Sequence, residues 1–419
     1  MSDTLIVCLR NQRLGRLWLG ERRRFAFQYD EAWLANQHAI PISIALPLRA
    51  DVYDDDTARP FFSNLLPEAE LRKLIARRLG FSEGNDFALL EAIGGECAGA
   101  VSLLPEGAEL SEEGEYRPLS NAEFNALLPE LPKRPLLAGE AGIRLSLAGV
   151  QNKLPVYYDE VTENICLPMG NAPSLHILKP AIAHIANSVE NEAFCMQLAE
   201  RIGLPVPNAT LLHKAVPIYL VDRYDRETGA DGKTLRLHQE DFCQALGIAP
   251  DMKYENEGGP SMQACFQLVR QVSIQPVADA KALLSWVIFN YLIGNADAHG
   301  KNVSLLLSEQ GPKLAPFYDL MCTAVYPDLI DRLAMRIGGE DRPDWIIERR
   351  WVQFARDIDV GYKMVQQALL NMSKKISTEA HALKEEFTMH HGECELIDQI
   401  ITVIEQRARK VAITLAAAK

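Results

Sequence analysis

The segment IGNADAHGKNVSLLL, residues 293–307, is the most informative one in this chain of 419 residues. An apolar run ends at Gly294, a polar loop follows, and a second apolar, strand-like run begins after it. Within the loop, Asp297 lies five residues before Asn302, and a further aspartate, Asp319, closes the later segment KLAPFYD. Because glycine commonly ends a helix, we expect a helix, a loop and a strand in this order.

These residue types are the ones that phosphoryl transfer from ATP requires. One carboxylate accepts or orients the proton of the substrate hydroxyl, while a second carboxylate and an amide hold the Mg²⁺ ions that neutralise the phosphate oxygens. The spacing of Asp297 and Asn302 equals that in the catalytic loop of protein kinases, and Asp319 matches the position of their downstream metal aspartate. We therefore predict that Asp297 is catalytic and that Asn302 and Asp319 bind Mg²⁺.

A cation for the phosphates is available upstream. Lys179 ends a strand-like run in HILKP, and Glu192 lies on the helix expected after it. A strand lysine paired with a helix glutamate is held against the phosphates of a nucleotide. The order of lysine, glutamate, catalytic aspartate, asparagine and metal aspartate is the order found in kinases.

A turn of small residues, SLAGVQNK at 146–153, precedes a further strand-like run. Ser146, Ala148 and Gly149 can expose backbone N–H groups there, as phosphate-covering loops do. We assign Ala148, Gly149 and Val150 of this turn to nucleotide binding.

Each of these segments also has an ordinary structural interpretation. An Asp/Asn pair commonly forms a turn or a cap, a lysine beside a proline lies on the surface, and short glycine turns are frequent. Only their joint order on the expected elements favours a kinase-like nucleotide site. We give His299, inside the loop, no chemical role beyond bracing the backbone.

Three other patterns are weaker. GECAG at 95–99 fits a nucleophile elbow with cysteine, but no clear strand leads into it. His390, His391 and Cys394 lack a further ligand pair for a metal. The basic run ERRR at 21–24 is typical of a solvated face, with a partner-facing or DNA-facing patch as the alternative.

Composition limits the function. Lys and Arg number 43 against 56 Asp and Glu, so the formal net charge is −13, and the pI is about 5.3. Such a chain is not built to coat nucleic acid or an anionic membrane. Eight scattered cysteines without CxxC or zinc spacing predict reduced thiols in a cytoplasmic protein. The apolar stretch 283–294 contains Asn290 and predicts a buried helix with no membrane span.

The N-terminal region predicts a strand-rich part. Residues 67–80 close on Gly80 and have helical spacing, which predicts a helix. The acidic residues 105–118 predict a surface loop, and the Pro- and Gly-rich residues 129–142 predict a domain boundary. The strands expected in this part are 4–9, a hairpin over 16–28, and 98–104.

The rest of the chain predicts a small mixed part followed by a helical part. A helix is expected over 187–202, with Asn187 and Glu190 forming a capping box and Gly203 ending it. A second, buried helix is expected over 281–293. The expected strands are 153–158, 175–179, 215–222, 303–307 and 313–317, with a hairpin turning at residues 231–232.

We therefore predict an α+β fold: a bilobal, protein-kinase-like arrangement with an N-terminal strand-rich subdomain and a mostly helical C-terminal lobe. The expected domains are the subdomain at 1–135, a small lobe with the phosphate loop and lysine at 136–238, and a helical lobe with the catalytic loop at 239–419. A cleft between the last two is the expected ligand site.

The chain resembles the HipA family, the serine/threonine-kinase toxins of bacterial type II toxin–antitoxin pairs. The resemblance covers nearly the whole chain, and ALLEAIGGECAGAVSLLP at 88–105 is similar to the family's N-terminal subdomain. The remaining motifs that carry it are RLSLAGVQNK (144–153), SVENE (188–192), VDRYDR (221–226), QEDFCQALG (239–247), KYENEGGP (253–260), GNADAHGKN (294–302) and PFYDL (316–320).

The resemblance implies a serine/threonine kinase that uses ATP and Mg²⁺, with Asp297 catalytic, Asn302 and Asp319 on the metal, and Lys179 on the phosphates. It also implies that the backbone of Asp222 to Tyr224 meets the adenine. Ser146 would be the family's self-phosphorylated loop serine. A phosphate of charge near −2 at this place would repel the phosphates of ATP and silence the kinase.

The resemblance further implies an aminoacyl-tRNA synthetase as substrate, growth arrest as outcome, and a small HipB-like DNA-binding antitoxin as partner, with DNA reached only through that complex. The chain departs from the protein-kinase pattern in two places. Asn295-Ala296 stands where His-Arg precedes the catalytic aspartate, and Leu320-Met321 follows Asp319 in place of the DFG Phe-Gly.

Two other functions remain open from the sequence. A small-molecule kinase with similar site geometry would have a deep acidic pocket beside Asp297. A catalytically inert kinase-like scaffold or co-repressor would keep the fold without the chemistry. The intact set Lys179, Asp297, Asn302 and Asp319 argues against the second.

Overall fold

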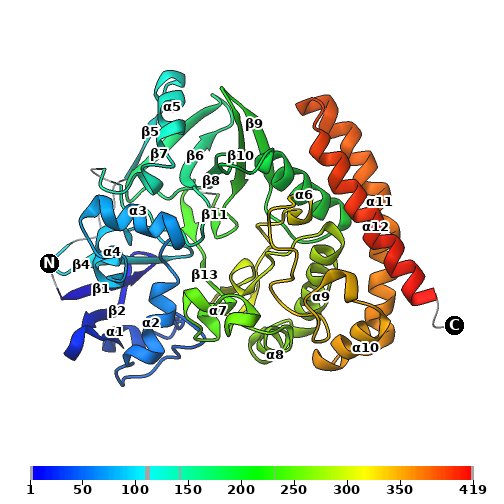
Figure 1. Cartoon of the computed structure of the whole chain (residues 1–419). Coiled ribbons are helices and arrows are strands. Elements are labelled where there is room, and N and C mark those ends of the chain that lie inside the picture. Colours follow the sequence, from blue (N-terminus) through cyan, green and yellow to red (C-terminus); the bar gives the residue numbers. More distant parts are fainter. Residues whose placement is uncertain (1–2, 109–113, 141–142, 231, 417–419) are drawn as a thin grey trace. The chain divides into compact units, whose positions relative to one another are not determined.

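A computed structural model of the chain describes residues 3–108, 114–140, 143–230 and 232–416 (Figure 1). The chain forms two compact units, and each mixes helices with strands, as the predicted α+β class requires. The three-domain division stays a prediction. Unit 1 comprises Met1–Pro180, Leu220–Asp251 and Leu305–Pro312; unit 2 comprises Ala181–Tyr219, Met252–Ser304 and Lys313–Lys419.

The N-terminal part of unit 1 contains a four-stranded sheet in the order β3-β2-β1-β4. Alternate residues of β3 are buried, which is the period-2 pattern of a strand with one face on the core. Its strands are β1 (Thr4–Leu9), β2 (Gln12–Leu19), β3 (Phe25–Tyr29) and β4 (Val101–Pro105). The helices here are α1 (Glu31–Leu34), α2 (Asp55–Ser63), α3 (Ala69–Leu79) and α4 (Asp86–Ile93). The predicted strands, and the helix that ends at Gly80, are confirmed.

A second sheet in unit 1 has neighbouring strands in the order β5-β7-β6-β8-β10. The prediction of a loop over 105–118 is wrong in part, because β5 (Gly114–Pro118) pairs with β7 as an exposed strand. Its polar sequence, GEYRP, gives no alternation signal, so only the pairing reveals the strand. The other strands are β6 (Leu154–Asp159), β7 (Asn164–Gly170), β8 (His176–Lys179) and β10 (Pro217–Asp222). Helix α5 spans Asn121–Leu127.

The end of unit 1 contains the predicted hairpin, β11 (Arg226–Thr228) with β12 (Thr234–Arg236); residue 231 of its turn lies outside the described residues. Strand β13 (His238–Asp241) and helix α7 (Phe242–Ala245) follow. Buried Glu240 ties β13 to the N-terminal part: Oε2 accepts a hydrogen bond from Ser43 Oγ (2.5 Å), and Oε1 accepts one from the Ile44 amide (2.8 Å). Burial raises the pKa of Glu240 to about 8.

Unit 2 is mainly helical, as predicted. Helix α9 is buried almost all round, including Trp286, Phe289 and Tyr291, and forms the centre of the unit. The helices are α6 (Ser188–Ile202), α8 (Met262–Val272), α9 (Pro276–Ile293), α10 (Glu348–Asp357), α11 (Tyr362–His391) and α12 (Glu395–Ala416). Among the described residues, no helix combines the length and apolar composition that a membrane crossing needs.

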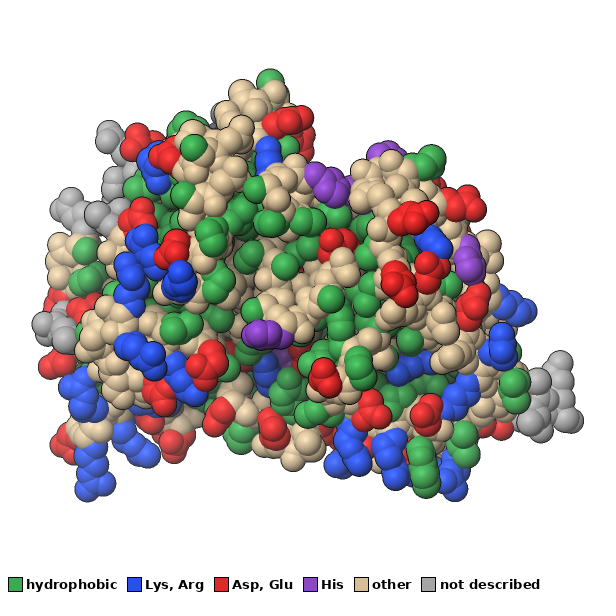
Figure 2. Space-filling model, turned by 45° about the horizontal axis from the view of Figure 1, so that its top comes forward, with side chains coloured by type: hydrophobic (Ala, Val, Ile, Leu, Met, Phe, Trp, Pro, Cys, Tyr) green, Lys and Arg blue, Asp and Glu red, His purple; other side chains and the backbone are tan. Residues whose placement is uncertain are grey.

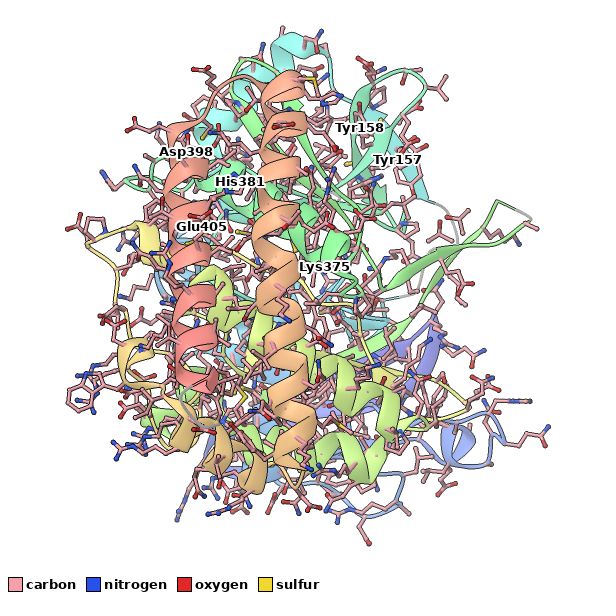
Figure 3. The ribbon with its side chains drawn as sticks, turned by 90° about the vertical axis from the view of Figure 1, so that its right-hand side faces the viewer. Tyr157, Tyr158, Lys375, His381, Asp398 and Glu405 are labelled. Atoms are coloured by element: carbon pink, nitrogen blue, oxygen red, sulfur yellow. The ribbon has the colours of Figure 1, made fainter. Side chains whose placement is uncertain are left out.

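Helices α11 and α12 lie side by side, as Figure 3 shows. His381 hydrogen-bonds Glu405 (2.9 Å), and Lys384 pairs with Asp398. These pairs are exposed and add little stability.

The start of α6 differs from the prediction. Asn187 is in the left-handed region (φ 52°) and its side chain makes no cap hydrogen bond, so the predicted capping box is wrong. Ser188 Oγ instead accepts a hydrogen bond from the Ile182 amide (2.8 Å). Gly203 ends the helix at φ 98°, as predicted. The short strands of unit 2 are β9 (Ala209–His213) and β15 (Lys313–Leu314), and β14 (Ser304–Leu307) begins at the unit's border.

Candidate functional site

The predicted catalytic loop begins where α9 ends at Gly294, in the left-handed region at φ 81°. A Cβ there would lie 2.8 Å from Ala324 Cβ, so the position requires glycine for space as well as conformation. Asn295 donates from Nδ2 to Asn290 Oδ1 (2.8 Å) and accepts at Oδ1 from the Asp297 amide (3.0 Å). The last turn of a buried helix therefore fixes the backbone of Asp297.

The loop closes on itself around Asp297. Asn302 Nδ2 donates to the Asp297 carbonyl (2.9 Å), and the Asn302 amide donates to the His299 carbonyl (2.9 Å). Asn302 is 6% exposed, whereas the Asp297 side chain is 47% exposed. The structure thus brings these two predicted residues together. The side-chain nitrogen of Asn302 is used by this hydrogen bond to Asp297. The side-chain oxygen Oδ1 is the atom that could bind Mg²⁺, because hard cations prefer oxygen ligands.

One oxygen of the Asp297 carboxylate already has a partner. Tyr254 Oη donates to Asp297 Oδ1 at 2.6 Å, and His299 Nε2 lies 3.9 Å from the same oxygen. The Tyr254 and His299 rings pack edge to face, with centroids 5.3 Å apart. Sequence analysis missed Tyr254, although it lies in KYENEGGP, one of the motifs that carries the HipA resemblance.

The segment around Asp319 is bonded to the same loop. Tyr318 Oη donates to the Lys301 carbonyl (2.7 Å). On the other side, Thr323 Oγ1 accepts from the Ala296 amide (2.8 Å). Asp319 lies between these two attachments, in the left-handed region at φ 60°, a conformation that costs a non-glycine residue about 1 kcal/mol or more. Such strain persists where the surroundings impose it, which is common at functional sites.

Helix α6 holds the Asp319 segment from another direction. Asn191 Nδ2 donates to the Cys322 carbonyl (2.9 Å), and its Oδ1 accepts from the Cys322 amide (2.8 Å). Sequence analysis missed Asn191, which neighbours the predicted Glu192 in SVENE. Glu192 is 1% exposed on α6 of unit 2, and Lys179 belongs to unit 1, so their ion pair stays a prediction.

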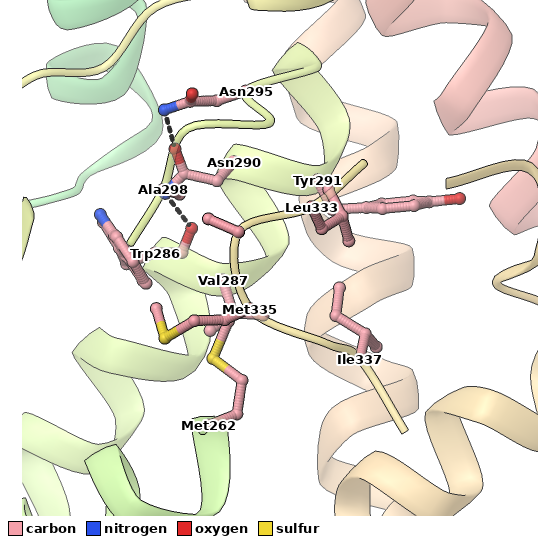
Figure 4. A pocket seen from close by; sticks show the side chains of 11 residues that line it. Met262, Trp286, Val287, Asn290, Tyr291, Asn295, Ala298, Leu333, Met335 and Ile337 are labelled. Atoms are coloured by element: carbon pink, nitrogen blue, oxygen red, sulfur yellow. Dashed lines mark hydrogen bonds between the residues drawn. The ribbon is translucent and has the colours of Figure 1, made fainter. Parts of the chain in front are cut away.

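A small cavity of about 20 Å³ lies behind the loop (Figure 4). It has room for about one water and is far too small for a nucleotide. Its walls come from α8, α9, the loop and residues 333–337, and they carry no carboxylate among the described residues. It is therefore not the acidic pocket expected of a small-molecule kinase. The lining residues are Met262, Trp286, Val287, Asn290, Tyr291, Asn295, Ala298, Leu333, Ala334, Met335 and Ile337.

In unit 1, strand β8 carries the predicted lysine. Lys179 is its last residue and is 6% exposed. At the start of the strand, His176 Nε2 lies 3.6 Å from Asp222 Oδ1. Lys179 lies three residues further along β8 than His176, which is about 10 Å of strand, so Asp222 lies near the start of β8 and Lys179 at its end.

Buried charges fix the predicted adenine-binding segment, Asp222 to Tyr224. Arg223 pairs with Asp225 (2.8 Å), and Arg226 pairs with Glu96 (2.7 Å). Burial alone would raise the pKa values of both carboxyls, but the adjacent guanidinium groups hold both below their usual range. Because these ion pairs are hydrogen-bonded on several sides, the strand end is held in one arrangement.

The predicted phosphate loop packs against the N-terminal part of unit 1. Ser146 is 0% exposed, and its Oγ donates to the Leu65 carbonyl (2.7 Å). Gly149 has φ 110° and its carbonyl accepts from the Glu68 amide (3.2 Å). Lys153 Nζ donates to the Ala148 carbonyl (2.5 Å).

Two consequences follow for the residues predicted in this loop. Val150 is half exposed, so the tip of the loop faces solvent. Ser146 is inaccessible in this conformation, so the loop would have to leave its place before the serine could be modified. The assignments of Ala148, Gly149 and Val150 to a nucleotide stay predictions.

The weaker candidates gain no support. Cys97 is fully buried, and burial raises its pKa to about 12, which leaves no reactive thiolate. His391 Nδ1 lies 2.7 Å from His213 Nε2, yet no cluster of three metal-binding side chains occurs among the described residues. On the face drawn in Figure 2, basic side chains of the described residues are interspersed with acidic ones.

Comparison with known proteins gives the class of this chain. The HipA-like C-terminal domain matches residues 145–382, and the HipA N-terminal domain matches residues 5–104. The first match alone covers more than half of the chain, including every predicted site residue. The chain belongs to the HipA family of serine/threonine-kinase toxins.

Several relatives extend over nearly the full length. A Sinorhizobium fredii protein named "Putative kinase Y4mE" is 43% identical over 395 residues, which is 93% of this chain and 94% of that protein. The "Serine/threonine-protein kinase toxin HipA" of Shewanella oneidensis is 33% identical, with 87% of this chain and 86% of that protein covered.

A solved structure is also similar. It is the Shewanella oneidensis toxin–antitoxin complex of HipA, HipB and operator DNA, with a TM-score of 0.82, 30% identity and 96% of each chain covered. This match confirms the predicted α+β fold with its strand-rich N-terminal part and helical C-terminal region.

Proposed function

We propose that this protein is an ATP-dependent serine/threonine protein kinase and the toxin of a bacterial toxin–antitoxin pair. The observation that carries the proposal is the bonding, inside unit 2, of the Asp297–Asn302 loop to the segment around Asp319. Two carboxylates and one amide oxygen are thereby held by one hydrogen-bonded framework. Phosphoryl transfer needs little more from a protein than such positioning.

Each residue has a distinct role in this proposal. Asp297 orients the substrate hydroxyl and accepts its proton. Asn302 and Asp319 hold Mg²⁺, which, when bound, neutralises charge on the phosphate oxygens. The inward-facing amide nitrogen of Asn302 keeps its own loop closed while its oxygen serves the ion.

Unit 1 would bind the nucleotide. Lys179 contacts the phosphates, with Glu192 as its charge partner, and the turn Ala148–Val150 covers them. The backbone from Asp222 to Tyr224 receives the adenine. About 10 Å of β8 separates Lys179 from His176, the neighbour of Asp222, and this suits the separation of base and phosphates in one extended nucleotide.

The partners follow from the family. We expect a small HipB-like antitoxin, DNA contact only through that complex, and an aminoacyl-tRNA synthetase as the substrate in the cytoplasm. The support is the similarity to the Shewanella oneidensis complex, which contains HipA, HipB and operator DNA. The net charge of −13 agrees with leaving DNA binding to the partner.

Self-phosphorylation of Ser146 would be the off-switch. Its hydroxyl proton is bonded to Leu65, so a phosphate there requires the loop to leave its buried place. The charge of about −2 would then keep the loop out of the apolar site and away from ATP phosphates.

The test is incubation of the protein with labelled ATP and a bacterial lysate, followed by identification of the labelled polypeptides. Asp297→Ala should lower the transfer rate by about 10²–10⁴-fold, and Asp319→Ala should abolish magnesium-dependent transfer, both with unchanged circular dichroism. Ser146→Ala should remove only the label on the kinase itself.

The labelling experiment, together with calorimetry of Mg-ATP binding, distinguishes the other functions. Label in a small metabolite and in no polypeptide would indicate a small-molecule kinase. Absence of Mg-ATP binding in calorimetry would indicate an inert scaffold or co-repressor. A wild-type rate in Asp297→Ala would refute the assignment of that residue.

A further inference from the structure

We propose that Tyr254 is the positioning residue for Asp297: its hydroxyl holds Oδ1 and thereby presents Oδ2 to the substrate hydroxyl. This inference rests on the proposed kinase function. It answers a question that the sequence raises, because the His-Arg pair that precedes the catalytic aspartate in protein kinases is replaced here by Asn295-Ala296. The neighbouring alanine cannot orient a carboxylate.

The hydrogen bond itself is short and well defined. Tyr254 Oη donates to Asp297 Oδ1 at 2.6 Å from a residue 43 positions upstream. A bond from a phenol to a carboxylate is charge-assisted and stronger than one between neutral groups. It fixes the rotation of the Asp297 side chain about its last torsion, which is otherwise broad.

The backbone near Tyr254 is tied to the loop as well. The Glu255 amide donates to the Ala334 carbonyl (3.0 Å), and the Ala334 amide donates to the Ala296 carbonyl (2.9 Å). One residue thus links the chain after Tyr254 to the residue before Asp297. These main-chain hydrogen bonds keep Tyr254 and Asp297 close to each other, in addition to the hydrogen bond between their side chains.

The ring of Tyr254 is also held. His299, itself 4% exposed, packs edge to face on it at 81°, and Lys253 Nζ lies 5.4 Å from the ring centroid. Gly259 allows the close turn that follows, because a Cβ there would lie 2.5 Å from the Met252 carbonyl oxygen. The phenol therefore approaches Asp297 from a fixed side.

This arrangement divides the two carboxylate oxygens between two tasks. Oδ1 faces Tyr254 and His299, inside the unit. Oδ2 remains for the substrate hydroxyl, since the side chain as a whole is 47% exposed. Without the phenol, the carboxylate rotates and spends less time in the productive orientation, so the loss appears in the chemical step and not in nucleotide binding.

The test compares Tyr254→Phe with the matched control Tyr362→Phe. Tyr362 also donates to a carboxylate, Glu348 Oε1 at 2.9 Å, but at the start of α11 and outside the catalytic loop. Tyr254→Phe keeps the ring and its packing on His299. We expect kcat to fall roughly 10- to 100-fold, with KM for ATP within about two-fold of wild type. Tyr362→Phe should leave both unchanged.

The outcomes separate this inference from the proposed function. A wild-type kcat in Tyr254→Phe overturns the positioning role, and a raised kcat means that the phenol blocks the carboxylate. A parallel rise in KM and in the calorimetric Kd for Mg-ATP means a structural role only. If Asp297→Ala also retains the wild-type rate, the proposed function itself fails.

Discussion

Two loops carry the predicted chemistry, and they are held in different ways. The catalytic loop at 294–304 is fixed by side chains of its own unit, from Asn290, Tyr318 and Thr323. The phosphate loop at 146–153 is fixed mostly by main-chain atoms of the N-terminal part. We therefore expect the first loop to lose its geometry when one of these side chains is changed, and the second to be released as a segment. Precise placement suits a catalytic residue, and releasability suits a loop that covers a nucleotide or is modified.

The largest effect should come from Asn191, the side chain that holds the segment around Asp319 next to the catalytic loop. Asn191→Ala removes both hydrogen bonds to Cys322. The buried backbone amide and carbonyl of Cys322 then lose these partners. We expect a loss of about 3 kcal/mol of unfolding free energy, measured by urea denaturation. Magnesium-dependent activity should fall further than stability alone explains, because Cys322 follows Asp319 by three residues.

The control for this change is Asn371→Ala. Asn371 is exposed on α11 and bonds only the neighbouring Gln367 (2.7 Å), so its loss should cost less than about 0.5 kcal/mol. Equal effects of the two substitutions would mean that the Asn191 clamp does not hold the catalytic segment.

A smaller effect should distinguish the N-terminal part of unit 1, which holds the phosphate loop, from the catalytic loop by its dependence on pH. Glu240 has a folded-state pKa of about 8 against 4.5 in the unfolded chain, so the folded state holds the extra proton between these values. The stability that this proton confers is present at low pH and is lost as pH rises through 8. Burial lowers the pKa of His238 to about 4, so this residue makes the protein less stable as pH falls below 6.5. Above pH 6.5 it does not change the stability.

Between pH 6.5 and 8, unit 1 should therefore lose up to about 2 kcal/mol. Glu240→Gln keeps an oxygen that accepts from the Ile44 amide, removes the charge, and places an amide N–H beside the Ser43 hydroxyl, which can turn to accept it; the substitution should flatten this dependence. Hydrogen-exchange protection factors, which are corrected for the intrinsic rise of exchange with pH, should fall between about pH 6.5 and 8 in the N-terminal part and not in the catalytic loop. An equal fall of the protection factors in both segments, or an unchanged pH dependence in Glu240→Gln, would contradict the assignment.

The same contrast explains what the sequence could predict. Asp297 and Asn302 share one loop whose ends are marked by Gly294 and by a strand, so local patterns suffice to bring them together. Asn191 and Tyr254 act across long chain separations through single polar bonds, which leave no period in the sequence. Both lie within motifs that carry the family resemblance, and that is the signal that could have identified them.

Two elements were mispredicted for local reasons. Strand β5 is polar and exposed, and depends on pairing with β7, so composition alone indicated a loop. Asn187 has the residue type of a cap, but its backbone lies in the left-handed region and Ser188 makes the side-chain bond instead. In both, tertiary context overrode a local preference.

The smallest effect should come from the phosphate loop itself. Gly149→Ala forces alanine to φ 110° and places a Cβ 2.7 Å from Lys153 Nζ. The control is Gly107→Ala, where alanine is forced to φ 83° but its Cβ meets open space, so only the cost of the backbone conformation remains. Both should cost about 1 kcal/mol of stability through backbone strain, since the lysine end can move aside. Only Gly149→Ala should also break the Lys153 bond to Ala148 and loosen the loop, which raises KM for ATP while kcat on saturating ATP stays near wild type. If kcat fell as well, the phosphate loop would be as strictly positioned as the catalytic loop. The distinction between a fixed catalytic loop and a releasable phosphate loop would then not hold.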